Sequence, residues 1–394
     1  MVTPTRSVRV FRILYRMIPR PEYSYALVAR RVVGFALVAL LLSGCSLFAA
    51  SGPPWVEMHP TIHPLQHGVS FLAAYDAATR QVVLYGGGTI VATGTQTWTW
   101  NGKRWTELHP AVHPPRHQEA VMAYDAQTKN CVLVVPLATL ANFPYRYRPI
   151  VQHMRSRKAI SAFLEQLYAK TRTWTWNGTS WTELHPSANP PASYGASMAY
   201  DAATGDVVFA GRSGDGFETW TWNGVNWTQQ HPTKSPSARA LFAMAYDPQV
   251  REVLLFGGVR GDYFGAPVFG DTWAWNGSTW MRLHPFASPP ARYLASMAFD
   301  PKIRELVLFG GTSSTSSAAG PQRVFGDTWA WNGANWIRLH PSVSPPARSG
   351  ASMAYDAATK SLVLFGGLGA YHSLSDTWSL RIATGSPRHV GRTQ

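Results

Sequence analysis

The segment Met353-Ala354-Tyr355-Asp356 decides the fold, because close copies of it recur along the chain. Each copy is followed by a short turn and an apolar run, such as Leu362-Val363-Leu364-Phe365-Gly366-Gly367. In most copies two closely spaced tryptophans, an Asn-Gly pair, a further tryptophan and a His-Pro pair complete the repeat, as in residues 273–285. The six copies of the first segment end at Asp76, Asp125, Asp201, Asp247, Asp300 and Asp356. All 17 tryptophans of the 394-residue chain occupy repeat positions, so the repeat accounts for most of the chain.

Each repeat predicts four short strands. The first ends before the aspartate, the second is the apolar run, the third contains the paired tryptophans, and the outer one begins at the last tryptophan. The aspartates are expected to cap the turns between the first two strands rather than to act as catalytic carboxylates. The Asn-Gly pairs predict hairpins between the third and fourth strands. Successive repeat aspartates lie 49, 76, 46, 53 and 56 residues apart, a period typical of propeller blades once an insertion is removed from the second interval.

The two ends of the repeat region predict how the ring closes. Residues 55–60 match the outer-strand segment 105–110, although no earlier strands precede them. Residues 376–380 form a third strand with no fourth after it. The N-terminal strand is therefore expected to complete the C-terminal blade, which gives an all-β, six-bladed propeller with both sheet edges covered.

These motifs resemble the kelch repeat, and the resemblance covers residues 55–382. The glycine pairs that follow the second strands carry it most clearly, at Gly257-Gly258, Gly310-Gly311 and Gly366-Gly367. The match is weaker at Ala210-Gly211 in the third blade and is lost at Val135-Pro136 in the second. Blade 2 instead carries an insertion over residues 136–172, in which apolar residues at helical spacing predict a helix. This helix either packs over the propeller or docks a partner or anionic lipid.

The N-terminal region predicts export and lipidation. Two arginines precede the uncharged apolar residues 32–42, and Leu42-Ser43-Gly44-Cys45 resembles a bacterial lipobox. The resemblance implies that residues 1–44 are a signal peptide and that Cys45 becomes the lipidated N-terminus. Residues 45–54 are then a short tether and residues 383–394 a C-terminal tail, with a monomeric propeller outside the cytoplasm. An uncleaved membrane anchor is the alternative, because residues 32–50 lack charge, and translation could also begin at Met17.

Composition and charge exclude several classes of function. With 45% hydrophobic and 14% charged residues, the chain is globular rather than disordered. The net charge of +14 comes from residues 1–44, 136–172 and the last nine, while the remaining body carries equal numbers of basic and acidic residues. A neutral body offers no broad surface for phosphates, so no nucleic-acid partner is expected.

Candidate ligand-binding residues lie where the chain enters each innermost strand. The loops between second and third strands vary most in length, and binding residues usually sit on such loops. The residue eight positions before the repeat aspartate borders the channel mouth on that same face. It is arginine in three blades, histidine in blade 2 and serine in blade 3: Arg239, Arg292, Arg348, His117 and Ser193. Kelch propellers resembling this one often carry arginine here. The arginines could bind carboxylates bidentately, or each could brace its own loop by bonding backbone carbonyls and stacking on aromatic rings.

Histidines at a repeated spacing form a second candidate site. They lie in the two loops that flank blade 1: His59, His63, His67, His109, His113 and His117. Six imidazoles on adjacent loops could hold Zn²⁺ or Cu²⁺, but the proline-rich, extended context argues against a preformed metal site, and no cofactor is expected.

Taken together, these features predict a lipid-anchored, extracytoplasmic binding module. Its expected ligand is an acidic glycan or an acidic protein segment. Two alternatives remain open: a carbohydrate-active enzyme with its site at the same channel mouth, and a structural component of an envelope assembly.

Overall fold

The computed structural model describes residues 51–52, 54–64, 71–87, 95–115, 119–136, 170–213, 216–260, 266–313 and 323–381. All of them belong to the compact unit formed by residues 51–394. The signal peptide, the lipidation residue Cys45, most of the blade 2 insertion and the C-terminal tail lie outside the described residues. Within the described ranges, no helix is long and apolar enough to cross a bilayer.

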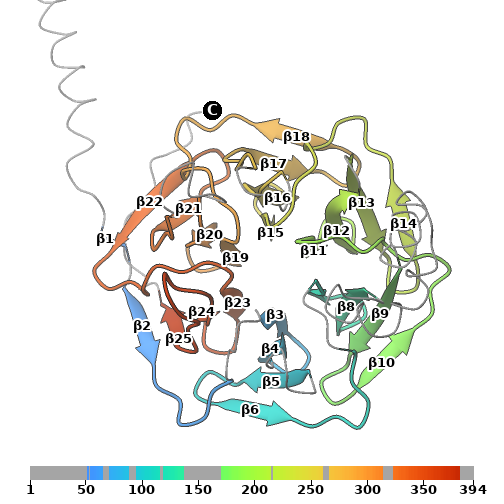
Figure 1. The fold of residues 1–394 in the computed structure, drawn as a ribbon, viewed down its shortest axis with the longest axis horizontal. Coiled ribbons are helices and arrows are strands. Elements are labelled where there is room, and N and C mark those ends of the chain that lie inside the picture. The colour runs from blue at the N-terminus through green and yellow to red at the C-terminus, as the bar shows by residue number, and fades with distance from the viewer. Residues whose placement is uncertain are drawn as a thin grey trace, which may run out of the picture. The chain divides into compact units, whose positions relative to one another are not determined.

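Six sheets of four antiparallel strands form the blades, as the sequence predicts. The sheets are arranged in a ring with their first strands innermost (Figure 1), and residues of these first strands line a central channel. Blade 1 contains β3 (Phe71–Asp76), β4 (Gln81–Gly86), β5 (Gln96–Trp100) and β6 (Trp105–Leu108). Blade 2 contains β7 (Val121–Asp125), β8 (Asn130–Pro136), β9 (Thr171–Trp176) and β10 (Trp181–Leu184). Blade 3 contains β11 (Ser197–Asp201), β12 (Asp206–Ser213), β13 (Gly216–Trp222) and β14 (Trp227–Gln230).

The other three blades repeat this order. Blade 4 contains β15 (Ala243–Asp247), β16 (Glu252–Phe256), β17 (Thr272–Trp275) and β18 (Trp280–Leu283). Blade 5 contains β19 (Ser296–Asp300), β20 (Glu305–Phe309), β21 (Thr328–Trp331) and β22 (Trp336–Pro341), with β1 (Ser51–Gly52) added in parallel to β22. Blade 6 contains β23 (Ser352–Asp356), β24 (Ser361–Phe365), β25 (Thr377–Leu380) and β2 (Trp55–Met58).

Ring closure through the N-terminal strand is confirmed. Strand β2 pairs antiparallel with β25, and Trp55 lies opposite Leu380 in the register. In Figure 1 the blue β2 lies directly beside the red β25. Both ends of the propeller therefore meet in blade 6, which leaves no third strand without its outer neighbour.

The hydrophobic core is divided among the interfaces between successive blades. The second strands are fully covered, as in β16 and β24, because sheets pack against both of their faces. A buried hydrogen bond also crosses each interface. The first tryptophan of every outer strand donates its indole N–H to a threonine at the start of the third strand in the preceding blade, at 2.9–3.1 Å. Because that threonine is present in all six repeats, every interface is joined in the same way, including the one that Trp55 makes with Thr328.

The turns on one face of the propeller confirm the role predicted for the repeat aspartates. Each aspartate is buried, and its Oδ1 accepts a hydrogen bond from the amide two residues later at 2.8–2.9 Å. The Asn-Gly hairpins also form, but their loops have four residues, because Trp275 pairs with Trp280. In this loop the Asn276 side chain accepts the amides of Ser278 and Thr279, and Gly277 adopts a φ of 93°. The asparagine is thus a cap rather than a left-handed residue.

The outer strands run along the circumference of the ring (Figure 1). As a result, the segments after the His-Pro pairs reach the Asn-Gly loop of the next blade, where Ser187 donates to Asn226 and Phe286 donates to Asn335. These segments thus connect each blade to the next one at the rim of the ring. The channel itself is lined by the inner strands and encloses about 200 Å³.

Candidate functional site

The three predicted arginines lie in one repeated arrangement in blades 4, 5 and 6. Arg239, Arg292 and Arg348 are at most 1% exposed. Each donates through Nη1 and Nη2 to both oxygens of one aspartate, with the closest contacts at 2.5–2.6 Å and the others at 2.8–3.0 Å. The partners are Asp271, Asp327 and Asp376. We call each such pair an Arg–Asp clamp.

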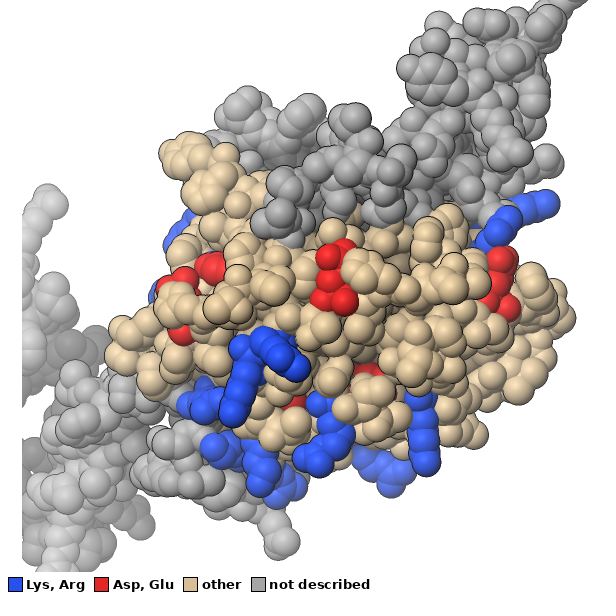
Figure 2. Space-filling view, turned by 90° about the horizontal axis from the view of Figure 1, so that it is seen from below, with Lys and Arg blue, Asp and Glu red and all other residues tan. Residues whose placement is uncertain are grey.

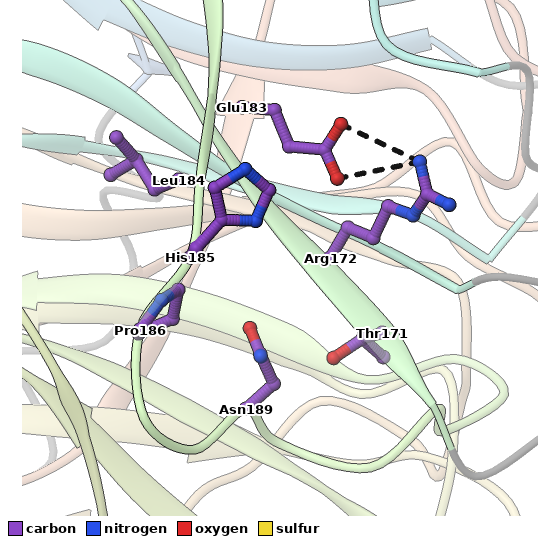
Figure 3. A pocket seen from close by; sticks show the side chains of 7 residues that line it. All are labelled: Thr171, Arg172, Glu183, Leu184, His185, Pro186 and Asn189. Atoms are coloured by element: carbon purple, nitrogen blue, oxygen red, sulfur yellow. Dashed lines mark hydrogen bonds and ion pairs between the residues drawn. The ribbon is translucent and has the colours of Figure 1, made fainter.

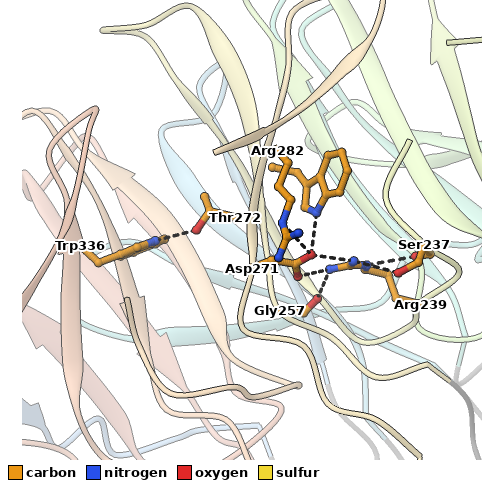
Figure 4. A network of polar contacts seen from close by, with 8 residues as sticks. Ser237, Arg239, Gly257, Asp271, Thr272, Arg282 and Trp336 are labelled. Carbon is orange, nitrogen blue, oxygen red and sulfur yellow. Dashed lines mark hydrogen bonds and ion pairs between the residues drawn. The ribbon is translucent and has the colours of Figure 1, made fainter. Parts of the chain in front are cut away.

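Backbone and aromatic contacts complete each clamp. In blade 4, Arg239 also donates to the carbonyls of Gly257 and Ser237 (Figure 4). Its guanidinium lies 4.0 Å from the centroid of the Phe269 ring. In blade 5, Arg292 makes the equivalent bonds to Gly310 and Pro290 and lies 3.9 Å from the Phe325 ring centroid. Each guanidinium therefore fixes the entry to its inner strand against the loop after the second strand.

The carboxylates of the clamps are held in their ionised form. Burial opposes ionisation of Asp271, Asp327 and Asp376, but hydrogen bonds and charge from the arginines outweigh it, so the pKa of each aspartate is lowered. Each clamp is consequently a neutral pair. The contacts are those expected for bracing, and the three arginines present no unpaired crescent of positive charge at the channel mouth.

The other two residues of this candidate set differ from the arginines. Ser193 in blade 3 is buried, and its Oγ accepts the amide of Arg212 at 2.7 Å. It thus ties the same loop to the end of the second strand without any charge. His117 lies outside the described residues. Among the described residues, Arg–Asp clamps therefore occur in blades 4–6, and blade 3 holds the corresponding loop through the neutral hydrogen bond of Ser193.

The residue at the position of the clamp aspartate differs among the blades, and blade 2 is the blade that carries a basic residue there. At this position, two residues before the first tryptophan of the third strand, blades 1, 2 and 3 carry Gln96, Arg172 and Glu218. In five blades the side chain here accepts the indole N–H of that tryptophan at 2.7–3.2 Å. In blade 2 the guanidinium of Arg172 contains no hydrogen-bond acceptor, and Nε1 of the buried Trp174 has no hydrogen-bond partner among the described residues.

A polar pocket of about 480 Å³ opens beside this position in blade 2 (Figure 3). Its lining includes Thr171, Arg172, Glu183, His185 and Asn189. Nη1 of Arg172 lies 3.3 Å from Oε1 of Glu183, and the two side chains are 47% and 25% exposed. In the equivalent pocket of blade 4, Asp271 is engaged with Arg239 in the clamp, and Nε of Arg282, whose side chain is 57% exposed, lies 4.0 Å from Oδ2 of the same aspartate. The blade 2 pocket combines an exposed cation with neighbouring neutral donors and acceptors.

The opposite face of the propeller carries exposed basic residues in its turns. They are Arg80, Lys103, Arg104, Lys129, Arg251, Lys302, Arg304 and Lys360. Figure 2 shows Lys and Arg side chains gathered along one face. The buried aspartates of the same turns lie beneath them, so this surface is not an uncompensated positive patch.

Four of the six candidate metal-binding histidines are described: His59, His63, His109 and His113. Among the described residues, no three His, Cys, Asp or Glu side chains lie close enough together to hold a metal ion. Nδ1 of His63 and of His113 lies 3.3–3.4 Å from the carbonyl oxygen of the following proline. His67 and His117 lie outside the described ranges, so the predicted six-histidine site is not tested. The second cysteine, Cys131, is a buried free thiol whose pKa burial raises, as its apolar strand predicts.

Comparison with known proteins supports the fold and goes no further. No family model matches the chain, and no curated protein sequence matches it. A solved structure titled "Structure of YjhT" is similar over 82% of this chain and 98% of its own, with a TM-score of 0.54 and 14% sequence identity. Because 319 chains of solved structures match, the propeller is a widely shared scaffold, and likeness at this identity carries no information about a ligand.

Proposed function

We propose that this protein is a kelch-type propeller that acts as a binding module, anchored outside the cytoplasm by a lipid on Cys45. Its ligand is an acidic glycan or an acidic protein segment, which binds at the polar pocket of blade 2. The lipobox-like segment at residues 42–45 supports the anchor, and the propeller fold, a common scaffold for interaction sites, supports a binding role.

The difference between the clamped arginines and Arg172 is the observation on which we base the choice of ligand and of binding site. Three arginines are neutralised within clamps, whereas Arg172 in blade 2 lies in an open pocket and is half exposed. Its single carboxylate neighbour, Glu183, contacts it through one nitrogen in the described structure. A guanidinium in this state retains donors for a second acidic partner, which a clamped arginine does not.

The binding proposal is tested by applying the full-length chain, purified in detergent, to an array of acidic and neutral glycans and acidic peptides. We expect saturable binding to acidic members, which Arg172→Ala abolishes. Arg338→Ala is the matched control, because Arg338 is also exposed on a strand but lies in blade 5. Equal loss in both variants, or binding to no acidic ligand, would refute the proposal.

The anchor is tested separately with Cys45→Ala. Wild-type protein expressed in a bacterium that processes lipoproteins should partition into the membrane fraction, and its N-terminal peptide should carry a diacylglyceryl mass. The variant should lose that mass. Retention of residues 1–44 in the wild-type protein would instead indicate an uncleaved membrane anchor.

A further inference from the structure

We propose that blade 2 contains a site for the carboxylate of a sugar acid, and that this carboxylate occupies the place taken by the clamp aspartate in blades 4–6. This inference rests on the binding function proposed above and specifies its ligand. The site combines the indole N–H of Trp174, the guanidinium of Arg172 and the polar wall of the adjacent pocket.

The first tryptophan of the third strand donates its indole N–H in five blades, and Trp174 in blade 2 is the exception. The equivalent tryptophans are Trp98, Trp220, Trp273, Trp329 and Trp378, and each donates Nε1–H to the side chain two residues earlier. The second tryptophan of the third strand is different: it is present in five blades, and in four of them its indole nitrogen has no partner among the described residues, so the lack of a partner is common to that position. Trp174 alone among the first tryptophans has lost an acceptor that its repeat position normally provides. An unpaired buried donor is costly, so a ligand oxygen that restores the bond gains stabilisation there.

The position of the missing acceptor follows from the repeat. In blade 4, Trp273 donates to Asp271, and Asp271 lines the pocket of that blade. Trp174 stands at the same place in blade 2, so its N–H is directed at the position of the residue 172 side chain. Arg172 instead turns towards Glu183 at the pocket wall (Figure 3). The indole nitrogen is buried in the free protein and Trp174 does not itself line the pocket, so we infer that a ligand reaches it by displacing the half-exposed Arg172 side chain.

Charge at this point favours a carboxylate. In the clamps, a carboxylate receives the indole N–H together with two guanidinium donors. Blade 2 retains the indole donor and carries Arg172 where the acid would stand. A carboxylate from outside the chain would receive an indole N–H together with guanidinium N–H groups, as a clamp aspartate does, with the guanidinium here supplied by the third strand instead of by the entry to the inner strand.

The remainder of the pocket favours a sugar over an acidic peptide. Asn189 is oriented by a hydrogen-bond chain in which Trp227 donates to Thr173 and Thr173 donates to Oδ1 of Asn189. Within the described residues the Asn189 amide nitrogen donates no hydrogen bond, and it faces the pocket together with Glu183 and His185. Hydroxyl groups both donate and accept, so they match an amide and a carboxylate side by side. Several ligand carboxylates would be repelled by Glu183, which disfavours an acidic peptide.

The direct test is NMR of the full-length chain labelled with ¹⁵N at tryptophan indoles, titrated with D-glucuronate. The Trp174 signal is identified by its absence in Trp174→Phe. We expect this signal to shift with saturation on adding D-glucuronate and to stay unchanged with D-glucose, which has similar hydroxyls and no carboxylate. No shift of the Trp174 signal at saturating D-glucuronate overturns the site. A stronger response to triglutamate than to D-glucuronate overturns the sugar-acid assignment.

Calorimetric titration of variants gives an independent readout. Arg172→Gln copies the arrangement of Gln96 in blade 1, so the chain fills its own acceptor position and D-glucuronate binding should be lost. Trp174→Phe should weaken binding by about tenfold or more, the loss expected for one hydrogen bond to a charged group. Trp98→Phe and Arg338→Gln are the matched controls and should bind as wild type does. If Trp174→Phe binds acidic array ligands normally while Arg172→Ala does not, this site is refuted while the proposed binding function stands. If the wild type binds no acidic ligand, both the proposed binding function and the sugar-acid site are refuted.

Discussion

Removal of one clamp arginine is expected to destabilise the propeller strongly, and Arg292→Ala is the clearest case. The substitution deletes two hydrogen bonds to Asp327, one each to the carbonyls of Gly310 and Pro290, and the stacking on Phe325. It also leaves the Asp327 carboxylate, whose side chain is 12% exposed, without a counter-charge. Breaking a buried ion pair by removing one partner costs about 3–5 kcal/mol. At about 2 °C per kcal/mol for a large domain, the melting temperature should fall by roughly 6–10 °C.

The assay is differential scanning calorimetry of the full-length chain in detergent, with Arg338→Ala as an exposed arginine control that should melt within about 1 °C of wild type. The double variant Arg292→Leu with Asp327→Asn should recover part of the loss, because no charge is then buried and the asparagine oxygen still accepts from Trp329. A melting temperature unchanged in Arg292→Ala would refute the bracing role. That result would favour the alternative interpretation, in which the arginines bind a ligand.

Three further outcomes follow from the same contacts. Because the pKa of each clamp aspartate is lowered, the stability that ionisation of these aspartates gives the wild type should be fully present above about pH 4, near the ordinary Asp pKa, and be lost as pH falls through the lowered values, as followed by melting temperature. Thr219→Val keeps the side-chain shape but removes the acceptor of the buried Trp280 indole, and should lower stability towards urea by about 1–3 kcal/mol; an unchanged midpoint would contradict the role given to that bond. Trp55→Ala should cost about 3–5 kcal/mol in thermal unfolding, because it empties a fully buried position at the closure of the ring, whereas a change near zero would show that β2 contributes little.

The repeat predicted the scaffold well because its signals are local. The Asp turns, the apolar second strands and the Asn-Gly loops are each specified within about ten residues, and the unmatched strand at residues 55–58 was enough to predict closure. The exact hairpin loop was not predicted, because Asn276 caps the loop with its side chain instead of adopting positive φ.

The contacts that define the site are long-range, and for that reason the sequence did not reveal them. Each clamp aspartate lies 28–35 residues after its arginine, across a loop whose length differs between blades. A usable signal did exist, since Asp-Thr-Trp occurs in blades 4–6, where the arginine also occurs, and is absent from blades 1–3. The unpaired indole of Trp174 could be recognised only once its five equivalents were seen to be paired.

Because β2 and β25 close the ring, the chain ends could be moved from blade 6 to another blade. Trp55 and Leu380 are register partners, as Trp275 and Trp280 are in blade 4, where a four-residue loop connects them. A loop of that length between Leu380 and Trp55 would give blade 6 the covalent connection that blade 4 has. The chain could then be cut at another Asn-Gly loop, giving a circular permutant whose six interfaces are the same as before. Loops from different blades, including those of blade 2, could in this way be moved next to either terminus without altering the packing between blades.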